Sequence, residues 1–143
     1  MVIKQLSVFL ENKEGRLCAA IDELTKNNVN ISALSLADTA EFGILRLIVD
    51  MPEKAKEVLE HSGVAVRLTD VIAVAMDDVP GGMSEILHIL KDASLNIEYM
   101  YACVGLVSGK ALTVMRLNDS KRGEDALRAA GYGKIKPEEI YRI

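Results

Sequence analysis

The sequence has no tryptophan and little aromatic character, because its two Phe and four Tyr make up only 4% of 143 residues. Half of the residues are nevertheless hydrophobic. A folded core must therefore be built from aliphatic side chains. The length is enough for one ordinary domain, or for two very small domains that share their burial. These numbers predict a globular protein.

Clustered positive charge and long apolar segments are also missing. The net charge is −4, and the nearest approach to a basic run is Lys121-Arg122. Proteins that bind nucleic acid need clustered Lys and Arg, so we expect no nucleic-acid partner. No stretch approaches the roughly 20 apolar residues that span a bilayer. The N-terminal segment alternates apolar with polar residues and has no uninterrupted apolar region. We therefore expect a cytoplasmic protein with no membrane partner.

Only two cysteines are present, Cys18 and Cys103, and they lie far apart in the sequence. In a reducing cytosol this usage predicts two buried free thiols rather than a disulfide. A metal-binding C-x-x-C pair is absent, so the sequence predicts neither a metal site nor a cofactor. His61 and His88 stand alone, and no Ser/His/Asp or paired-carboxylate pattern is found. We therefore predict no catalytic residues and no enzyme activity.

What the sequence does contain is an internal repeat. A shift of 66 residues places one amphipathic helical face over another, Gly15 over Gly81, and Asn30-Ile31 over Asn96-Ile97. Later the offset becomes 68 and places Gly63 over Gly131, so we expect the two extra residues in the turn before the third strand. The matching apolar positions are Leu17, Ala20, Ile21 and Leu24 in the first copy and Met83, Ile86, Leu87 and Leu90 in the second.

Each copy has the pattern of strand, helix, strand, strand, helix, strand. In the first copy the strands are predicted at residues 3–10, 30–37, 44–49 and 64–68, and the helices at 16–27 and from Met51-Pro52-Glu53 to Gly63. This order is the ferredoxin-like βαββαβ unit. The predicted fold class is therefore α+β, with two ferredoxin-like units in tandem whose antiparallel sheets are covered by helices.

No linker separates the two copies. The run from Val64 to Met76 lacks Gly, Pro and Ser, so the last strand of unit 1–70 must pass almost directly into the first strand of unit 71–143. This continuity predicts one tightly packed body. The C-terminal segment Glu139–Ile143 aligns with the strand that opens the second copy, and we predict a strand there that completes a sheet edge.

The same corner follows the first strand of each copy: Asn12-Lys13-Glu14-Gly15 and Asp78-Val79-Pro80-Gly81. Together with the order of elements and the Asn-Ile that begins each second strand, these corners resemble the ACT domain, a small amino-acid-sensing module. The usual corner of that family is Asn-x-Pro-Gly; here the first corner lacks the Pro and the second has Asp for Asn. The resemblance covers nearly the whole chain twice and implies a tandem ACT protein with no enzyme attached.

Physical chemistry supports amino-acid binding at such a corner. A helix N-terminus presents free N–H groups to a carboxylate, and glycine allows the backbone close to a ligand. Asn12 could give or accept a hydrogen bond, and Asp77 or Asp78 could hold the ammonium group. The alternative is that Asn12 and Asp78 only cap the following helices. The predicted ligand-binding residues are Asn12, Lys13, Glu14, Gly15, Arg16, Leu17, Asn30 and Ile31 in the first copy, and Asp78, Val79, Pro80, Gly81, Gly82, Met83, Asn96 and Ile97 in the second.

We expect Asn30 and Ile31 to back the first corner, and Asn96 and Ile97 the second. One corner is too shallow to bury a small zwitterion, so each site should face the neighbouring unit or a second chain. Ligand binding would then change shape or assembly, and the partner to be regulated would be a metabolic enzyme.

Two other functions remain open from the sequence. One is an interaction module without a ligand. Tyr99 and Tyr101 lie on one face of a predicted strand and Met100 on the other, so neither face is strongly polar, and Tyr and Met are favoured at interfaces. A homodimer, or close packing of the two domains, is expected in either case. The other is an acylphosphatase-like hydrolase with Arg16 and Asn30 on its oxyanion, although the phosphate loop of that family is absent.

Overall fold

The computed structural model describes residues 1–38, 42–107 and 110–141, which form an α+β fold with two compact units. One unit contains Lys4–Thr69, and the other contains Met1–Ile3 with Asp70–Tyr141. The boundaries between the two units lie at residues 3–4 and 69–70, and each of them falls within a strand. No helix in the described ranges has the length and hydrophobicity to cross a membrane.

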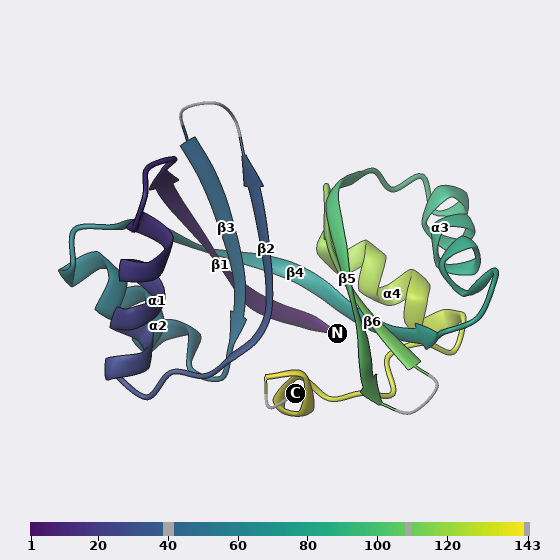
Figure 1. The fold of residues 1–143 in the computed structure, drawn as a ribbon. Coiled ribbons are helices and arrows are strands. Elements are labelled where there is room, and N and C mark those ends of the chain that lie inside the picture. The colour runs from purple at the N-terminus through teal and green to yellow at the C-terminus, as the bar shows by residue number, and fades with distance from the viewer. Residues whose placement is uncertain (39–41, 108–109, 142–143) are drawn as a thin grey trace. The chain divides into compact units, whose positions relative to one another are not determined.

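The unit of Lys4–Thr69 has the predicted ferredoxin-like order of elements. Its strands are hydrogen-bonded in the order β2-β3-β1-β4, and α1 and α2 pack together (Figure 1). The predicted hairpin is confirmed, since β2 and β3 pair antiparallel with Leu34 opposite Leu47. The elements are β1 (Val2–Glu11), α1 (Arg16–Lys26), β2 (Ile31–Asp38), β3 (Phe42–Val49), α2 (Pro52–His61) and β4 (Ala65–Asp77).

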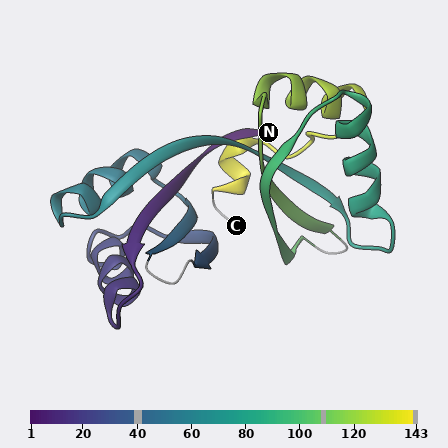
Figure 2. The same ribbon diagram turned by 90° about the horizontal axis from the view of Figure 1, so that it is seen from above.

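The core of this unit lies between its sheet and its two helices. Leu6, Val8 and Leu10 of β1 are buried, whereas Phe9 between them is 46% exposed, so the predicted alternation along this strand is confirmed. Leu24 of α1 and Leu59 of α2 are buried in the same cluster. In Figure 2 the two helices lie together on one side of the strands.

The unit of Asp70–Tyr141 repeats this order but does not end in a strand. Its strands follow the order β4-β6-β5, and Met1 adds to the other edge of β4, where its carbonyl accepts a hydrogen bond of 2.8 Å from the Ala73 N–H. The further elements are α3 (Gly82–Asp92), β5 (Ile97–Val107), β6 (Lys110–Leu117), α4 (Ser120–Ala129) and α5 (Pro137–Ile140).

The predicted C-terminal strand is wrong, because residues 137–140 form the short helix α5. Pro137 occupies the first turn, where its missing N–H costs no hydrogen bond, and the Glu139 carboxylate accepts a 2.8 Å hydrogen bond from the Lys136 N–H. These two local features favour a helix start. Arg142 and Ile143 lie outside the described residues, as do residues 39–41 and 108–109, within the hairpin turns where we placed the two-residue difference between the copies.

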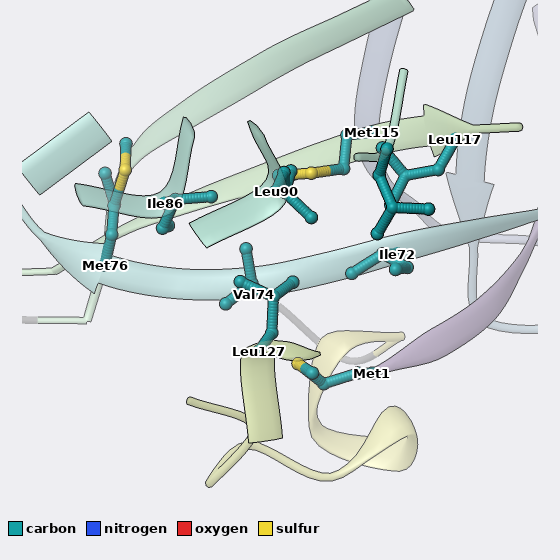
Figure 3. Packing of buried hydrophobic residues seen from close by; sticks show 11 residues of the cluster. Met1, Ile72, Val74, Met76, Ile86, Leu90, Met115, Leu117 and Leu127 are labelled. Carbon is teal, nitrogen blue, oxygen red and sulfur yellow. The ribbon is translucent and has the colours of Figure 1, made fainter. Parts of the chain in front are cut away.

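The core of the second unit is aliphatic and methionine-rich, as the composition predicts. Ile72 and Val74 of β4 face Ile86 and Leu90 of α3 and Leu127 of α4 (Figure 3). Met1 joins this cluster and is only 2% exposed. Its side chain lies beside Leu127 in Figure 3, so an N-terminal residue helps to complete the core of the C-terminal unit.

The passage from the first copy to the second is one strand, β4, of 13 residues. This confirms the predicted absence of a linker within Val64–Met76. The predicted buried thiols are correct only in part. Cys18 and Cys103 are both free, but Cys18 lies exposed near the start of α1 and Cys103 is partly buried. Burial raises the pKa of the Cys103 thiol.

Candidate functional site

The first corner is a tight turn between β1 and α1. The Lys13 N–H donates to the Glu11 carbonyl at 2.8 Å, and the Arg16 N–H donates to the Lys13 carbonyl at 3.3 Å. Gly15 then adopts φ +79°, a left-handed conformation that favours glycine. The hydrogen bonds of α1 begin with the Ala19 N–H and the Gly15 carbonyl, 2.9 Å apart. The N–H groups of Leu17 and Cys18 are therefore left at the open end of the helix.

The second corner repeats this geometry 66 residues later. The Gly82 N–H donates to the Val79 carbonyl at 3.1 Å, and the Glu85 N–H donates to the Gly81 carbonyl at 3.0 Å. Gly81 has φ +98°. Because each bond has its counterpart at the first corner, the sequence repeat reflects one backbone turn made twice. The N–H groups of Met83 and Ser84 are left at the open end of α3.

The side chains of Asn12 and Asp78 do not cap these helices. The N-cap residues are Gly15 and Gly81, and neither helix has a side-chain cap. Asn12 and Asp78 are exposed, and within the described ranges neither side chain has a hydrogen-bond or ion-pair partner. The capping alternative is therefore wrong, and both polar groups are available to a ligand.

At the first corner the carboxylate of Glu11 contacts two cations. Its carboxylate lies 3.3 Å from the Lys13 ammonium group and 3.2 Å from the Arg16 guanidinium. The hydrogen bond from Lys13, followed by the charges of Lys13 and Arg16, lowers the pKa of Glu11. Two of the predicted ligand-binding residues are thus already engaged with a carboxylate of the chain. Glu11 itself was not predicted, although its place at the strand end was a usable signal.

Gly82 has a different role from the one expected of it. It is buried, and a Cβ at this position would collide with the carbonyl oxygen of Asp77. The absence of a side chain at Gly82 therefore lets the backbone of Asp77 lie close to it. It does not serve the approach of a ligand. Gly15 and Gly81, by contrast, are exposed with open space beside them. Of the three glycines predicted to bind a ligand, Gly15 and Gly81 therefore remain suited to close approach of a small molecule.

Asn30 and Ile31 do not back the first corner. Glu11 pairs with Phe42 at one end of β3, whereas Ile31 pairs with Val49 at the other. At roughly 3.3 Å per residue the two places are about 20 Å apart. The arrangement predicted for Asn30 and Ile31 is therefore wrong, because α1 carries the chain from one end of the sheet to the other.

Asn96 and Ile97 are equally remote from the second corner, because Asp77 pairs with Lys110 while Ile97 pairs with Leu117. The two asparagines instead start strands. The Asn30 N–H donates to the Asp50 carboxylate and the Asn96 N–H to the Asn118 side-chain carbonyl, both at 3.0 Å. The two asparagines recur in the sequence because each makes the same type of backbone hydrogen bond just before a strand.

The same separation contradicts the hydrolase alternative. Arg16 begins α1 at the first corner, and Asn30 precedes β2 at the far end of the sheet. The two side chains cannot hold one oxyanion. Among the described residues, no group of three or more His, Cys, Asp and Glu side chains is arranged to bind a metal ion.

The residues that do adjoin the first corner come from the β2–β3 hairpin. A hollow of about 50 Å³ is lined by Asn12, Lys13 and Leu17 together with Leu36 and Gly43, and by Leu10 and Glu11. Sequence reasoning missed Leu36 and Gly43, which the antiparallel hairpin register would have placed there. Ligand pockets usually measure about 300–1,000 Å³, so this hollow holds only part of a small molecule.

The family model of the ACT domain pair matches residues 1–140. Protein BT0572 from Bacteroides thetaiotaomicron is 38% identical, with a TM-score of 0.94 over 100% of this chain and 98% of that one. Among curated proteins, no sequence matches the chain.

Two more distant structures share the fold. The regulatory subunit of aspartate kinase from Thermus thermophilus, in its ligand-free form, is 17% identical with a TM-score of 0.68, over 92% of this chain and 95% of that one. The corresponding subunit from Thermus flavus is 13% identical with a TM-score of 0.60, over the same shares of 92% and 95%.

Proposed function

Because the chain belongs to the ACT domain pair family, we propose that it is a cytoplasmic regulatory protein that binds a free amino acid at its strand–helix corners. The observation that carries this proposal is the first corner itself. There an unpartnered, exposed Asn12 stands beside the open N-terminus of α1. A polar acceptor next to free N–H groups matches the two charged groups that every free amino acid has.

The ligand carboxylate binds the N–H groups of Leu17 and Cys18, where the helix dipole favours negative charge. The Asn12 side-chain oxygen accepts a hydrogen bond from the ligand ammonium group. Gly15 keeps the approach open, since no atom lies within 4 Å of the place where its Cβ would stand. The second corner offers a carboxylate, Asp78, in place of the amide, and binds the ammonium group more strongly.

A second copy of the chain supplies the missing wall of the site. The hollow beside Asn12 is too small to enclose an amino acid, and Leu17 and Leu36, which line it, are 39% and 44% exposed. Leu34, on the same face of edge strand β2, is 56% exposed. An apolar surface on an edge strand is suited to association with another protein surface. Ligand binding between two copies then couples to their assembly.

The protein acts without catalysing a reaction, and passes the ligand signal to a metabolic enzyme through a change in shape or assembly. Exposed leucines would also suit an interaction module without a ligand. Amino-acid binding distinguishes the two functions.

The test is thermal unfolding of the purified protein in the presence of each of the twenty amino acids. A ligand at 100 times its dissociation constant should stabilise the fold by about 2.7 kcal/mol. We expect one amino acid, or a small group of related ones, to raise the melting temperature in a concentration-dependent way. If none of the twenty does so, the regulatory ligand is not a free amino acid and this function is wrong.

A further inference from the structure

One edge of β4 in the second unit is open over a short length. The Ala73 N–H points to this edge, because it donates to the Met1 carbonyl at 2.8 Å. Backbone groups of residues two apart in a strand face the same edge, so those of Ala75 also point there. Strand β6 pairs along the opposite edge. Within the described ranges, no backbone group pairs with the Ala75 N–H or carbonyl on this open edge.

The edge is open because the second copy departs from the repeat after α4. In the first copy the residues after α2 continue as β4 in the sheet. Gly131 has φ +90°, like Gly63 with φ +82° at the matching place of the first copy. The copies differ after this point, because Gly133 also has a positive φ of +92° and the chain proceeds to α5 instead of forming a last strand. Tyr132 aligns at an offset of 68 with Val64, the residue just before β4, but the described residues after Tyr132 form no strand, and Tyr132 borders the open edge.

A pocket of about 380 Å³ lies along this edge and is large enough for a small metabolite. We call it the strand-edge pocket. Its lining includes Asp77 and Glu85 on either side of the second corner, but none of residues 78–84. It is lined by residues 73–77 of β4, Glu85 of α3, Lys110 of β6 and residues 130–135.

The polar side chains of this pocket balance in charge. The Asp77 carboxylate pairs with the Lys110 ammonium group, and the Tyr132 hydroxyl is hydrogen-bonded to Glu85. Burial, followed by this contact with Glu85, raises the pKa of Tyr132, so the hydroxyl stays neutral. With Lys134, the lining carries two carboxylates and two ammonium groups. Such a lining matches a ligand with one charge of each sign.

We propose that the strand-edge pocket binds one free α-amino acid as a zwitterion, hydrogen-bonded to the backbone of Ala75. In a hydrogen-bonded antiparallel pair, each residue uses its own nitrogen and its own carbonyl oxygen. The ammonium and carboxylate of a free amino acid reproduce that pair. The ammonium donates to the Ala75 carbonyl, and the carboxylate accepts from the Ala75 N–H. Lys110 and Asp77 complement the two charges from the rim.

The length of the open edge selects a single residue rather than a longer peptide. Met1 occupies the edge beside Ala73, so an extended peptide paired with Ala75 would meet it in one direction. This proposal rests on the proposed function in one respect, that the ligand is an amino acid. It differs in the atoms that bind, so the two sites can be tested separately.

The test is a titration of the ¹⁵N-labelled protein with each amino acid, followed by amide NMR. Binding in the strand-edge pocket should shift the signals of Ala75, Asp77 and Tyr132. Shifts at Leu17 and Cys18 alone would support the proposed corner site and overturn the pocket. Shifts at Ala75 and Tyr132 without those at the corners would support the pocket and overturn the corner sites. If no amino acid shifts any signal, both are wrong.

Two variants make the assignment sharper. Ala75→Pro removes the N–H that faces the pocket, and proline is tolerated where a strand edge is unpaired. Loss of a hydrogen bond to a carboxylate should weaken binding about tenfold or more. Lys110→Gln keeps the backbone intact and should weaken binding by a smaller factor. The control Lys121→Gln removes an exposed charge of α4 and should bind as the wild type. Unchanged affinity in both pocket variants would overturn the proposal.

Discussion

At the scale of single residues, the first corner is defined by a carboxylate that holds two cations. Glu11 ends β1, and its carboxylate contacts the side chains of Lys13 and Arg16 in the turn that follows. The second corner has Asp77 at the matching place, and its cation comes instead from Lys110 on β6. The two corners therefore share a backbone but differ in the charges around it. Under the proposed function, this difference gives each corner its own ligand preference.

The lowered pKa of Glu11 gives a direct test of this arrangement. In Lys13→Ala the largest cause of the shift is removed, so the pKa of Glu11 should rise toward its ordinary value. The measurement is an NMR pH titration of the Glu side-chain carboxyls. Lys26→Ala, which removes a cation bound to Glu23, should leave Glu11 unchanged. If the pKa of Glu11 is the same in Lys13→Ala as in the wild type, Lys13 does not stabilise the charged carboxylate and this account of the corner is wrong.

Sequence reasoning at this scale succeeded where a residue has a backbone reason to recur. Gly15 and Gly81 recur because the turn requires a left-handed residue at that point. Asn30 and Asn96 also recur, but for a hydrogen bond at the far end of the sheet. A repeat marks a shared local structure and does not say which function that structure serves. For this reason the repeat predicts the turn at each corner correctly, but it does not show that Asn30 and Asn96 lie at the other end of the sheet.

At the scale of elements, α4 is tied to the first residue of the chain. The Glu124 carboxylate lies 2.8 Å from the Arg128 guanidinium and 3.6 Å from the Met1 ammonium group. Burial alone would raise the pKa of Glu124, but the hydrogen bond from Arg128 and the charge of the N-terminus outweigh it, and the pKa is lowered. These contacts hold the charged form in the folded state.

Glu124→Gln should therefore lower stability in a pH-dependent way. The folded-state pKa lies below the unfolded one, so the contribution is fully present above the ordinary pKa of Glu. It is lost as the pH falls through the lowered value. We expect the variant to unfold about 0.5–1 kcal/mol more easily at pH 7, as for other partly exposed ion pairs. Urea unfolding of both proteins across this pH range is the measurement.

The exposed carboxylate of Glu138 provides the control for this experiment. Glu138→Gln should unfold like the wild type at every pH. A loss of stability in Glu124→Gln that persisted unchanged in acid would contradict the ion-pair account and indicate a packing role instead.

The element scale also shows where prediction from sequence reached its limit. The strands and helices of both copies follow from periodicity, and β4 follows from the absence of breaking residues. The C-terminal segment was mistaken for a strand because it aligns with one, while Pro137 and Glu139 favour a helix start locally. The open edge beside Ala75 depends on that difference, so no alignment of the two copies could reveal it.

At the scale of the whole molecule, the proposed regulation depends on the association of two copies. The apolar surface formed by Leu17, Leu34 and Leu36 adjoins the first corner. Sedimentation velocity should show a homodimer whose affinity rises with the bound amino acid. Leu34→Lys places a charge on this surface and should weaken the dimer by at least tenfold, because an unpaired charge would be buried.

Thr25→Lys, an exposed change on α1, should leave the dimer intact. Dimers of equal strength in Leu34→Lys and the wild type would place the interface elsewhere on the chain. A monomer at every concentration would contradict association altogether.

The most direct test of amino-acid binding at the corner is calorimetric titration of Gly15→Val beside Gly63→Val. Both glycines are exposed, with φ +79° and +82° and open space around them, so valine strains the backbone alike at each. Only Gly15 lies at the corner. We predict that Gly63→Val binds the stabilising amino acid like the wild type, whereas Gly15→Val loses binding to the first site. Equal affinity and stoichiometry in all three proteins would show that the corner is only a structural turn.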